Sequence, residues 1–134
     1  MKDQQIQLVK KSWAKVSHDP QFLGALFYNH LFQVAPELRP YFVNNIEEQQ
    51  VKLVKMIDYL VSHIDNLTII EEQVKPLAKR HISYGTEPHH YQIIGKNLIW
   101  VLAQELGDEW NDKLEEAWKE LYQTIANFMI KESQ

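Results

Sequence analysis

The chain has 134 residues, of which 45% are hydrophobic and 24% are charged, and its 14 basic and 18 acidic residues give a net charge of −4. This length and charge balance indicate one domain over residues 1–134 and exclude a strongly basic surface for nucleic acid or an anionic membrane. The absence of cysteine excludes disulfides, thiolate metal sites and thioether-attached pigments. The N-terminus has no apolar signal core and no stretch is long enough for a membrane span, so we expect a cytoplasmic protein.

The first part of the chain predicts three helices. The apolar face of the first one recurs at helical spacing and contains Ile6, Val9, Trp13 and Val16. Asp19 and Pro20 are typical of an N-cap followed by proline in the first turn, and they open a second helix that runs to about Val34. A short third helix begins at Pro36 and ends near Phe42.

Two long helices follow in the middle of the chain. The segment Asn45-Ile-Glu-Glu48 resembles a capping box and opens the fourth helix, whose apolar face contains Leu53, Ile57, Leu60 and Ile64. The apolar face of the fifth helix contains Ile70, Val74, Leu77 and His81. This helix stops near Gly85, because glycine suits a left-handed C-terminal cap.

Two further helices complete the pattern. Pro88 opens the sixth helix, which ends at Gly107 and has an apolar face formed by Tyr91, Ile94, Leu98 and Val101. The apolar face of the last helix contains Leu114, Trp118, Leu121, Ile125 and Met129. No alternating strand pattern competes with this interpretation, so the sequence predicts an all-α fold of about seven helices.

Three polar side chains interrupt apolar faces in three different helices, namely Tyr28, Gln49 and His81. Burying a polar group without a partner costs roughly 1–3 kcal/mol. Each residue also has an ordinary explanation, as a packed histidine, a core tyrosine or a polar residue in a first helical turn. Taken together, they favour a polar or metal-containing group between the helices, and haem is the simplest such group.

Other candidate motifs predict little chemistry. We expect no multi-histidine zinc or di-iron site from the remaining histidines, which are His18, His30, His63, His89 and His90. Paired acids are interpreted as solvated helix faces, at Glu47-Glu48, Glu71-Glu72 and Glu115-Glu116. The chain contains no glycine-rich phosphate loop and no Gly-x-Ser-x-Gly nucleophile elbow.

The sequence resembles the globin family, and especially the single-domain bacterial globins related to the haem domain of flavohaemoglobins. The resemblance extends from about Leu8 to Tyr122. Its most specific segments are Leu26-Phe-Tyr-Asn-His-Leu-Phe32, Ala35-Pro-Glu-Leu-Arg-Pro-Tyr-Phe42, Leu77-Ala-Lys-Arg-His81 and His90-Tyr-Gln-Ile-Ile-Gly95. It implies a globin fold around a haem b cofactor.

The resemblance also implies roles for individual residues. His81 matches the proximal iron ligand, and Phe42 matches the phenylalanine that packs on the porphyrin. Tyr28 and Gln49 match a distal pair of ligand-binding residues, and Leu53 matches the apolar residue one turn after Gln49 on the same helix.

Further matches concern the surroundings of the cofactor. Tyr91 matches a tyrosine beside the proximal histidine, whereas Ser133 stands where relatives have a glutamate, so weaker electron donation from that histidine is expected. Gly24 matches a small residue at a close helix crossing, although Gln50 at the partner position is larger than in animal globins. Three more residues are expected near the cofactor, Ile94 at its face and Lys52 and Arg80 at its propionates.

These matches imply an oxygen-binding haem protein. Ferrous haem passes electron density to O2, so hydrogen bonds from Tyr28 and Gln49 predict slow O2 release, with CO gaining much less. Without a distal histidine, unliganded ferrous iron is expected to be five-coordinate. One alternative is nitric oxide (NO) dioxygenase activity with a separate reductase, because the flavin domain of flavohaemoglobins is missing from this sequence. Another alternative is a gas or redox sensor.

Overall fold

The computed structural model describes residues 1–42 and 45–132, and these ranges contain helices and no strand. The helices are α1 (Asp3–Val16), α2 (Pro20–Val34), η1 (Pro36–Tyr41), α3 (Ile46–Ser62), α4 (Leu67–Ser83), α5 (Pro88–Leu106), η2 (Gly107–Glu109) and α6 (Asp112–Glu132), of which η1 and η2 are 3-10 helices. The predicted all-α fold is therefore confirmed. The short η2 after α5 was not predicted. None of the described helices is both long and apolar enough to cross a membrane.

Local side-chain chemistry explains most helix ends. The Asp19 carboxylate accepts a hydrogen bond from the Phe22 backbone N–H, as expected for the N-cap of α2. The Asn45 side chain caps α3 by accepting from the backbone N–H groups of Glu47 and Glu48. Helix α3 ends at Ser62, earlier than the predicted apolar face, and Ile64 is buried in the turn that follows.

Helix α4 ends in a Schellman motif. Gly85 has a φ of +82°, the left-handed conformation that glycine adopts without a steric penalty. Its N–H donates to the Ile82 carbonyl at 3.0 Å, and the Thr86 N–H donates to the His81 carbonyl at 3.1 Å. These bonds define the end of the helix that carries His81, and they confirm the predicted cap at Gly85.

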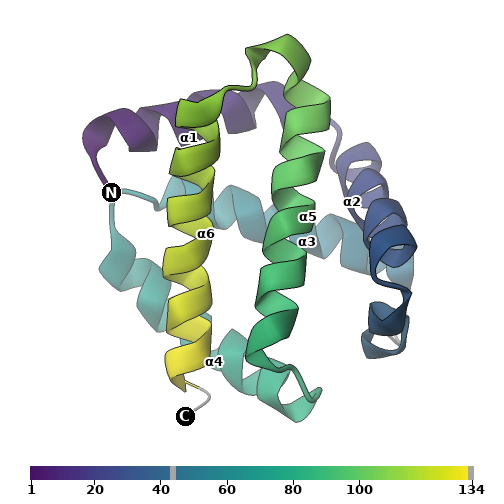
Figure 1. Ribbon diagram of the computed structural model, residues 1–134. Coiled ribbons are helices and arrows are strands. Elements are labelled where there is room, and N and C mark those ends of the chain that lie inside the picture. Colours follow the sequence, from purple (N-terminus) through teal and green to yellow (C-terminus); the bar gives the residue numbers. More distant parts are fainter. Residues whose placement is uncertain (43–44, 133–134) are drawn as a thin grey trace.

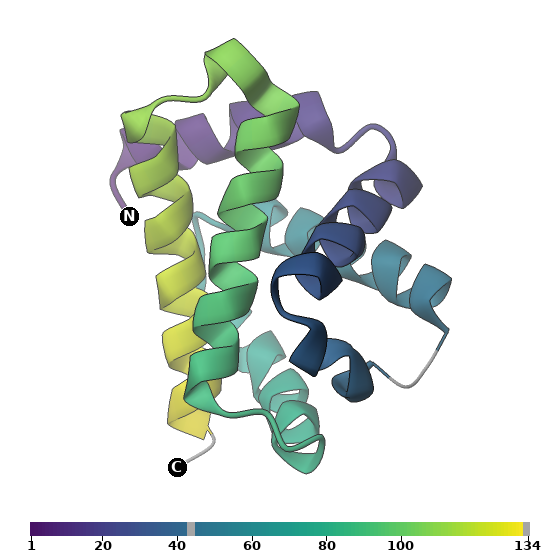
Figure 2. The same cartoon turned by 45° about the vertical axis from the view of Figure 1, so that its right-hand side comes forward.

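The helices pack in crossed pairs around a shared interior. Figures 1 and 2 show α5 and α6 running antiparallel side by side, with α1 crossing one end of this pair and α4 lying at the other. Helix α2 packs against α3 and α5, and α4 packs against α6. The main core contains Trp13 and Trp118, and a smaller cluster joins Ile70, Val74 and Ala78 to Met129.

The crossing of α2 and α3 depends on Gly24. A Cβ atom at this position would lie 2.6 Å from the Gln50 carbonyl oxygen and 2.7 Å from the Gln50 Cβ. Such approaches are shorter than real contacts, so only glycine allows the two backbones to come this close. The close crossing implied by the family resemblance is therefore present despite the larger Gln50 side chain.

We predict that Gly24→Val destabilises the protein by about 1–3 kcal/mol, because the new side chain meets backbone that cannot rotate away. The free energy of unfolding in urea measures the effect. Gln33→Val is the matched control, since it places the same side chain at an exposed position of the same helix. Equal stability of the two variants would contradict the steric argument.

Candidate functional site

A cavity of about 330 Å³ lies between the helices, and its lining is mostly apolar. Residues from α2, η1, α3, α4, α5 and α6 contribute to it. The lining includes most of the residues predicted to surround a cofactor, namely Tyr28, Phe42, Gln49, Leu53, His81, Tyr91 and Ile94. Folding thus brings together side chains that lie far apart in the sequence, in a cavity of the size typical of ligand pockets.

His81 reaches the cavity from the last turns of α4 with a fixed ring orientation. Its Nδ1 atom lies 2.8 Å from the Leu77 carbonyl oxygen. A carbonyl oxygen can only accept a hydrogen bond, so Nδ1 carries the proton and Nε2 keeps its lone pair. Burial lowers the pKa of His81, and the positive charge of Arg80 acts in the same direction, whereas the hydrogen bond to Leu77 raises it. Because the net shift is downward, the imidazole is neutral at pH 7. A neutral, oriented imidazole is a good metal ligand.

Tyr28 enters the same cavity from α2 and is only 5% exposed. Its ring packs edge-on against Phe27 and Phe42, with ring centres 5.2 Å apart in both pairs. Burial raises the pKa of Tyr28 to about 12, so the phenol is protonated at physiological pH. Tyr28 can therefore donate a hydrogen bond, held in place by an aromatic cluster that also includes Phe32.

Gln49 and Leu53 belong to the first turns of α3. Both side chains are partly buried and line the cavity, one helical turn apart. The carboxamide of Gln49 offers two N–H donors, whereas Leu53 offers only apolar surface. Because Asn45 caps the start of this helix, the position of Gln49 follows from the local backbone.

Tyr91 connects the cavity to the packing of α5 on α6. Its backbone carbonyl accepts a hydrogen bond from the Tyr122 hydroxyl at 2.5 Å. The Tyr122 ring fits because residue 95 is glycine, where a Cβ would lie 2.6 Å from the ring. The ring centres of His81 and Tyr91 are 6.4 Å apart at an interplanar angle of 24°. Ser133, which the resemblance aligns with a glutamate, lies outside the described residues.

Two predicted cofactor contacts lie elsewhere. Lys52 and Arg80 are exposed and do not line the cavity, so their pairing with propionates stays a prediction. Conversely, four lining residues were not predicted from the sequence. They are Tyr41 in η1, Tyr84 and Thr86 between α4 and α5, and His90 in the first turn of α5. Tyr41 and Tyr84 are large, exposed aromatic residues at helix ends, but periodicity does not reveal what such residues face.

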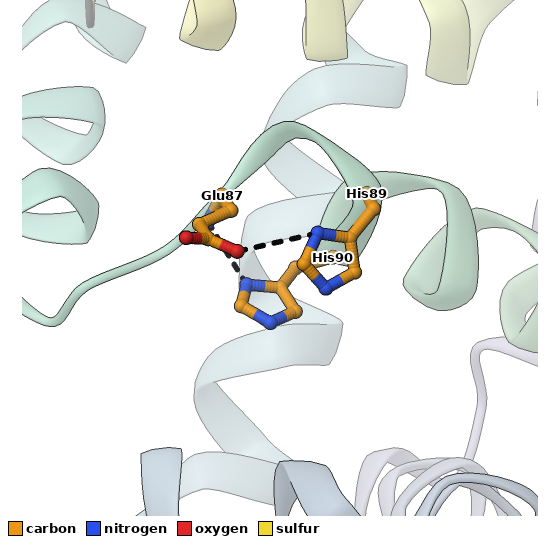
Figure 3. A group of neighbouring side chains, drawn as sticks. All are labelled: Glu87, His89 and His90. Atoms are coloured by element: carbon orange, nitrogen blue, oxygen red, sulfur yellow. Dashed lines mark hydrogen bonds and ion pairs between the residues drawn. The ribbon is translucent and has the colours of Figure 1, made fainter.

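The remaining histidines require a correction. Glu87 and His90 have the Glu-x-x-His spacing that sequence analysis overlooked, and His89 lies between them. One potential ligand atom from each of these three residues lies within 4.8 Å of the others. Figure 3 shows the three side chains at the start of α5. The sequence therefore does contain a Glu-x-x-His spacing, at Glu87 and His90, whereas the expectation of no multi-histidine zinc or di-iron site stays a prediction.

Comparisons with known proteins agree with this architecture. The family model described as Globin matches residues 25–129. The Flavohemoprotein of Rhodopirellula baltica is 29% identical over 133 residues, which cover 97% of this chain and 33% of that protein. The Flavohemoprotein of Halalkalibacterium halodurans is 33% identical over 129 residues, which cover 93% of this chain and 31% of that protein. Neuroglobin-1 of Oncorhynchus mykiss is 25% identical over 139 residues, which cover 93% of this chain and 87% of that protein.

This chain belongs to the globin family. It spans about a third of the length of the flavohemoproteins that it matches. Membership implies a haem protein that binds diatomic gases. The cavity fits such a group, because its lining combines an oriented, neutral imidazole, broad apolar surface and two polar donors from other helices.

We predict that the His81→Gly variant retains little haem, because His81 is the histidine that α4 contributes to the cavity lining. Adding free imidazole should restore binding by filling the vacated space. The intensity and position of the Soret absorption band measure both effects. Ser83→Gly controls for the lower helix propensity of glycine, since Ser83 is exposed on the same helix. An unaltered Soret band in His81→Gly would exclude His81 as the ligand.

Proposed function

We propose that this protein is an oxygen-binding haem-b globin that holds O2 firmly and releases it slowly. The observation that carries the proposal is the presence of two hydrogen-bond donors, Tyr28 and Gln49, in the same cavity as the His81 imidazole. When bound, haem b supplies a ferrous iron that takes up diatomic gases and passes electron density to O2. His81 would hold the iron through Nε2, and Phe42, Leu53, Tyr91 and Ile94 would pack on the porphyrin.

Tyr28 determines how firmly the gas is held. Its protonated phenol would donate a hydrogen bond to the partly negative outer oxygen atom, and the Gln49 carboxamide would donate a second one. A hydrogen bond to a charged acceptor contributes about 1.5–3 kcal/mol. Since about 1.4 kcal/mol corresponds to a tenfold change, one donor slows O2 release roughly 10- to 100-fold. A CO ligand is less polar and gains much less.

The same residues bear on the unliganded iron. Two histidines line the cavity among the described residues, His81 from α4 and His90 from α5, whereas α2 and α3, which carry Tyr28 and Gln49, contribute none. The Tyr28 phenol also keeps its proton. Five-coordinate ferrous iron in the absence of a gas stays a prediction. Lys52 and Arg80 are proposed to reach the propionates from the surface, and a cytoplasmic location stays a prediction.

We predict that Tyr28→Phe raises the O2 dissociation rate roughly 10- to 100-fold, because it removes only the donor hydroxyl. Stopped-flow displacement of O2 by excess CO measures this rate. The dissociation rate of CO itself should change far less. Tyr41→Phe is the matched control, since it makes the same chemical change at an exposed cavity residue. If both variants released O2 at the wild-type rate, Tyr28 would have no part in holding the gas.

Nitric oxide dioxygenation is a second candidate function, supported by the similarity to flavohemoproteins. Each turnover would combine one NO and one O2 into nitrate and take one electron from a separate flavin-containing reductase. The hydrogen bonds that hold O2 would keep it in the cavity until NO arrives.

We predict that the oxygenated protein consumes about one equivalent of NO without a reductase, and consumes it continuously once a flavin reductase and NADH are added. An NO electrode and nitrate analysis measure both phases. The reductase without the globin gives the background rate. If the globin leaves this background rate unchanged, the protein is not a dioxygenase under these conditions, whereas the O2 proposal is tested separately by the dissociation rates. Gas or redox sensing stays a prediction from the sequence alone.

A further inference from the structure

A second group of potential metal ligands lies at the start of α5. Figure 3 shows the side chains of Glu87, His89 and His90 gathered around the first turn of this helix. The Glu87 carboxylate oxygen Oε2 lies 3.4 Å from His89 Nδ1. The ring centres of His89 and His90 are 4.2 Å apart. The group therefore offers one oxygen and two nitrogen donors within a small volume.

The backbone arranges two of these ligands before any ion binds. Glu87 is the N-cap of α5, and its backbone carbonyl accepts from the backbone N–H of His90 at 2.9 Å. In return, the Glu87 N–H donates to His90 Nδ1 at 2.9 Å. These reciprocal bonds fix the start of the helix, and Pro88 fixes the backbone between them. Because His90 Nδ1 accepts this hydrogen, its lone pair is directed at the Glu87 backbone N–H.

Packing on the other side limits the freedom of His90. Its side chain is buried, and the Tyr41 ring meets it edge-on with ring centres 4.7 Å apart. His90 also lines the cavity described above, as does Tyr41. His89, in contrast, is exposed to solvent. His90 is thus held in place at the cavity wall, whereas His89 is accessible to an ion from solvent.

Negative charge approaches the His90 imidazole from two elements. Glu87 immediately precedes α5 and Glu37 belongs to η1, and the carboxylates of both act electrostatically on this ring. A cation bound beside His90 would therefore lie near two acidic side chains.

We propose that Glu87, His89 and His90 bind a divalent transition-metal ion, Zn²⁺ or Cu²⁺, at the edge of the cavity. Two imidazole nitrogens and one carboxylate oxygen form a donor set that suits these ions, and Cu²⁺ binds such sets more tightly than Zn²⁺. A tetrahedral ion with bonds of about 2.0–2.2 Å holds its ligand atoms roughly 3.3–3.6 Å apart. The 3.4 Å between Glu87 Oε2 and His89 Nδ1 already meets this requirement. The metal would replace the backbone hydrogen bond at His90 Nδ1 and would leave a position open to water.

Calorimetric titration of the haem-loaded protein with ZnCl₂ and with CuSO₄ tests the proposal. We expect one ion per chain, with Cu²⁺ bound more tightly. His89→Ala should weaken the affinity for both ions by about 10-fold or more, because it removes a direct ligand while altering only an exposed side chain. His18→Ala is the matched control, since it removes an exposed histidine far along the chain from the cluster. Glu87→Gln, which keeps the size of the side chain, should also weaken binding.

A second measurement separates this cluster from the proposed haem ligand. His81→Ala without haem should bind Zn²⁺ at the cluster with the affinity of the wild-type protein. For the Cu²⁺ form, electron paramagnetic resonance should show coupling to nitrogen that decreases in His89→Ala. The proposal is overturned if no saturable binding of one ion per chain occurs, or if His89→Ala binds the ions as tightly as His18→Ala does.

Discussion

The hydrogen bond between His81 Nδ1 and the Leu77 carbonyl is the interaction on which the site depends. It fixes the tautomer of the imidazole, so that Nε2 keeps its lone pair on a residue that lines the cavity. Burial keeps the ring neutral, so that a lone pair is available to a metal at pH 7. The Schellman motif at Gly85 ends α4 one turn later and uses the His81 carbonyl as an acceptor. Two separate backbone features therefore fix one side chain.

The approach of α2 to α3 provides the chemistry of the other cavity walls. Gly24 permits a separation at which no side chain fits between this position and Gln50. Consequently Tyr28, one turn further along α2, and Gln49, next to Gln50, both reach the cavity. Burial keeps the Tyr28 phenol protonated and therefore able to donate. This close contact lies beside both of the proposed hydrogen-bond donors of the cavity.

The first turn of α5 serves both the cavity and the proposed metal site. Tyr91 lines the cavity, and its carbonyl is held by Tyr122 of α6. One residue earlier, His90 exchanges hydrogen bonds with the Glu87 backbone and also lines the cavity wall. An ion held by His90 and Glu87 would stiffen this part of the cavity wall. The short connection between α4 and α5 keeps the proposed metal ligands close in the chain to the end of the helix that carries His81.

The sequence by itself determined the helices, their caps at Asp19 and Gly85, and the polar residues Tyr28, Gln49 and His81, because helical periodicity and capping are local properties of the chain. It identified which face each residue occupies but not how far apart the faces lie. Only the tertiary structure brought the residues around η1 and the α4–α5 connection to the cavity, and only it left Lys52 and Arg80 outside the lining. The physical reason is that distances between helices depend on close contacts such as those at Gly24 and Gly95, and on packing between residues far apart in sequence.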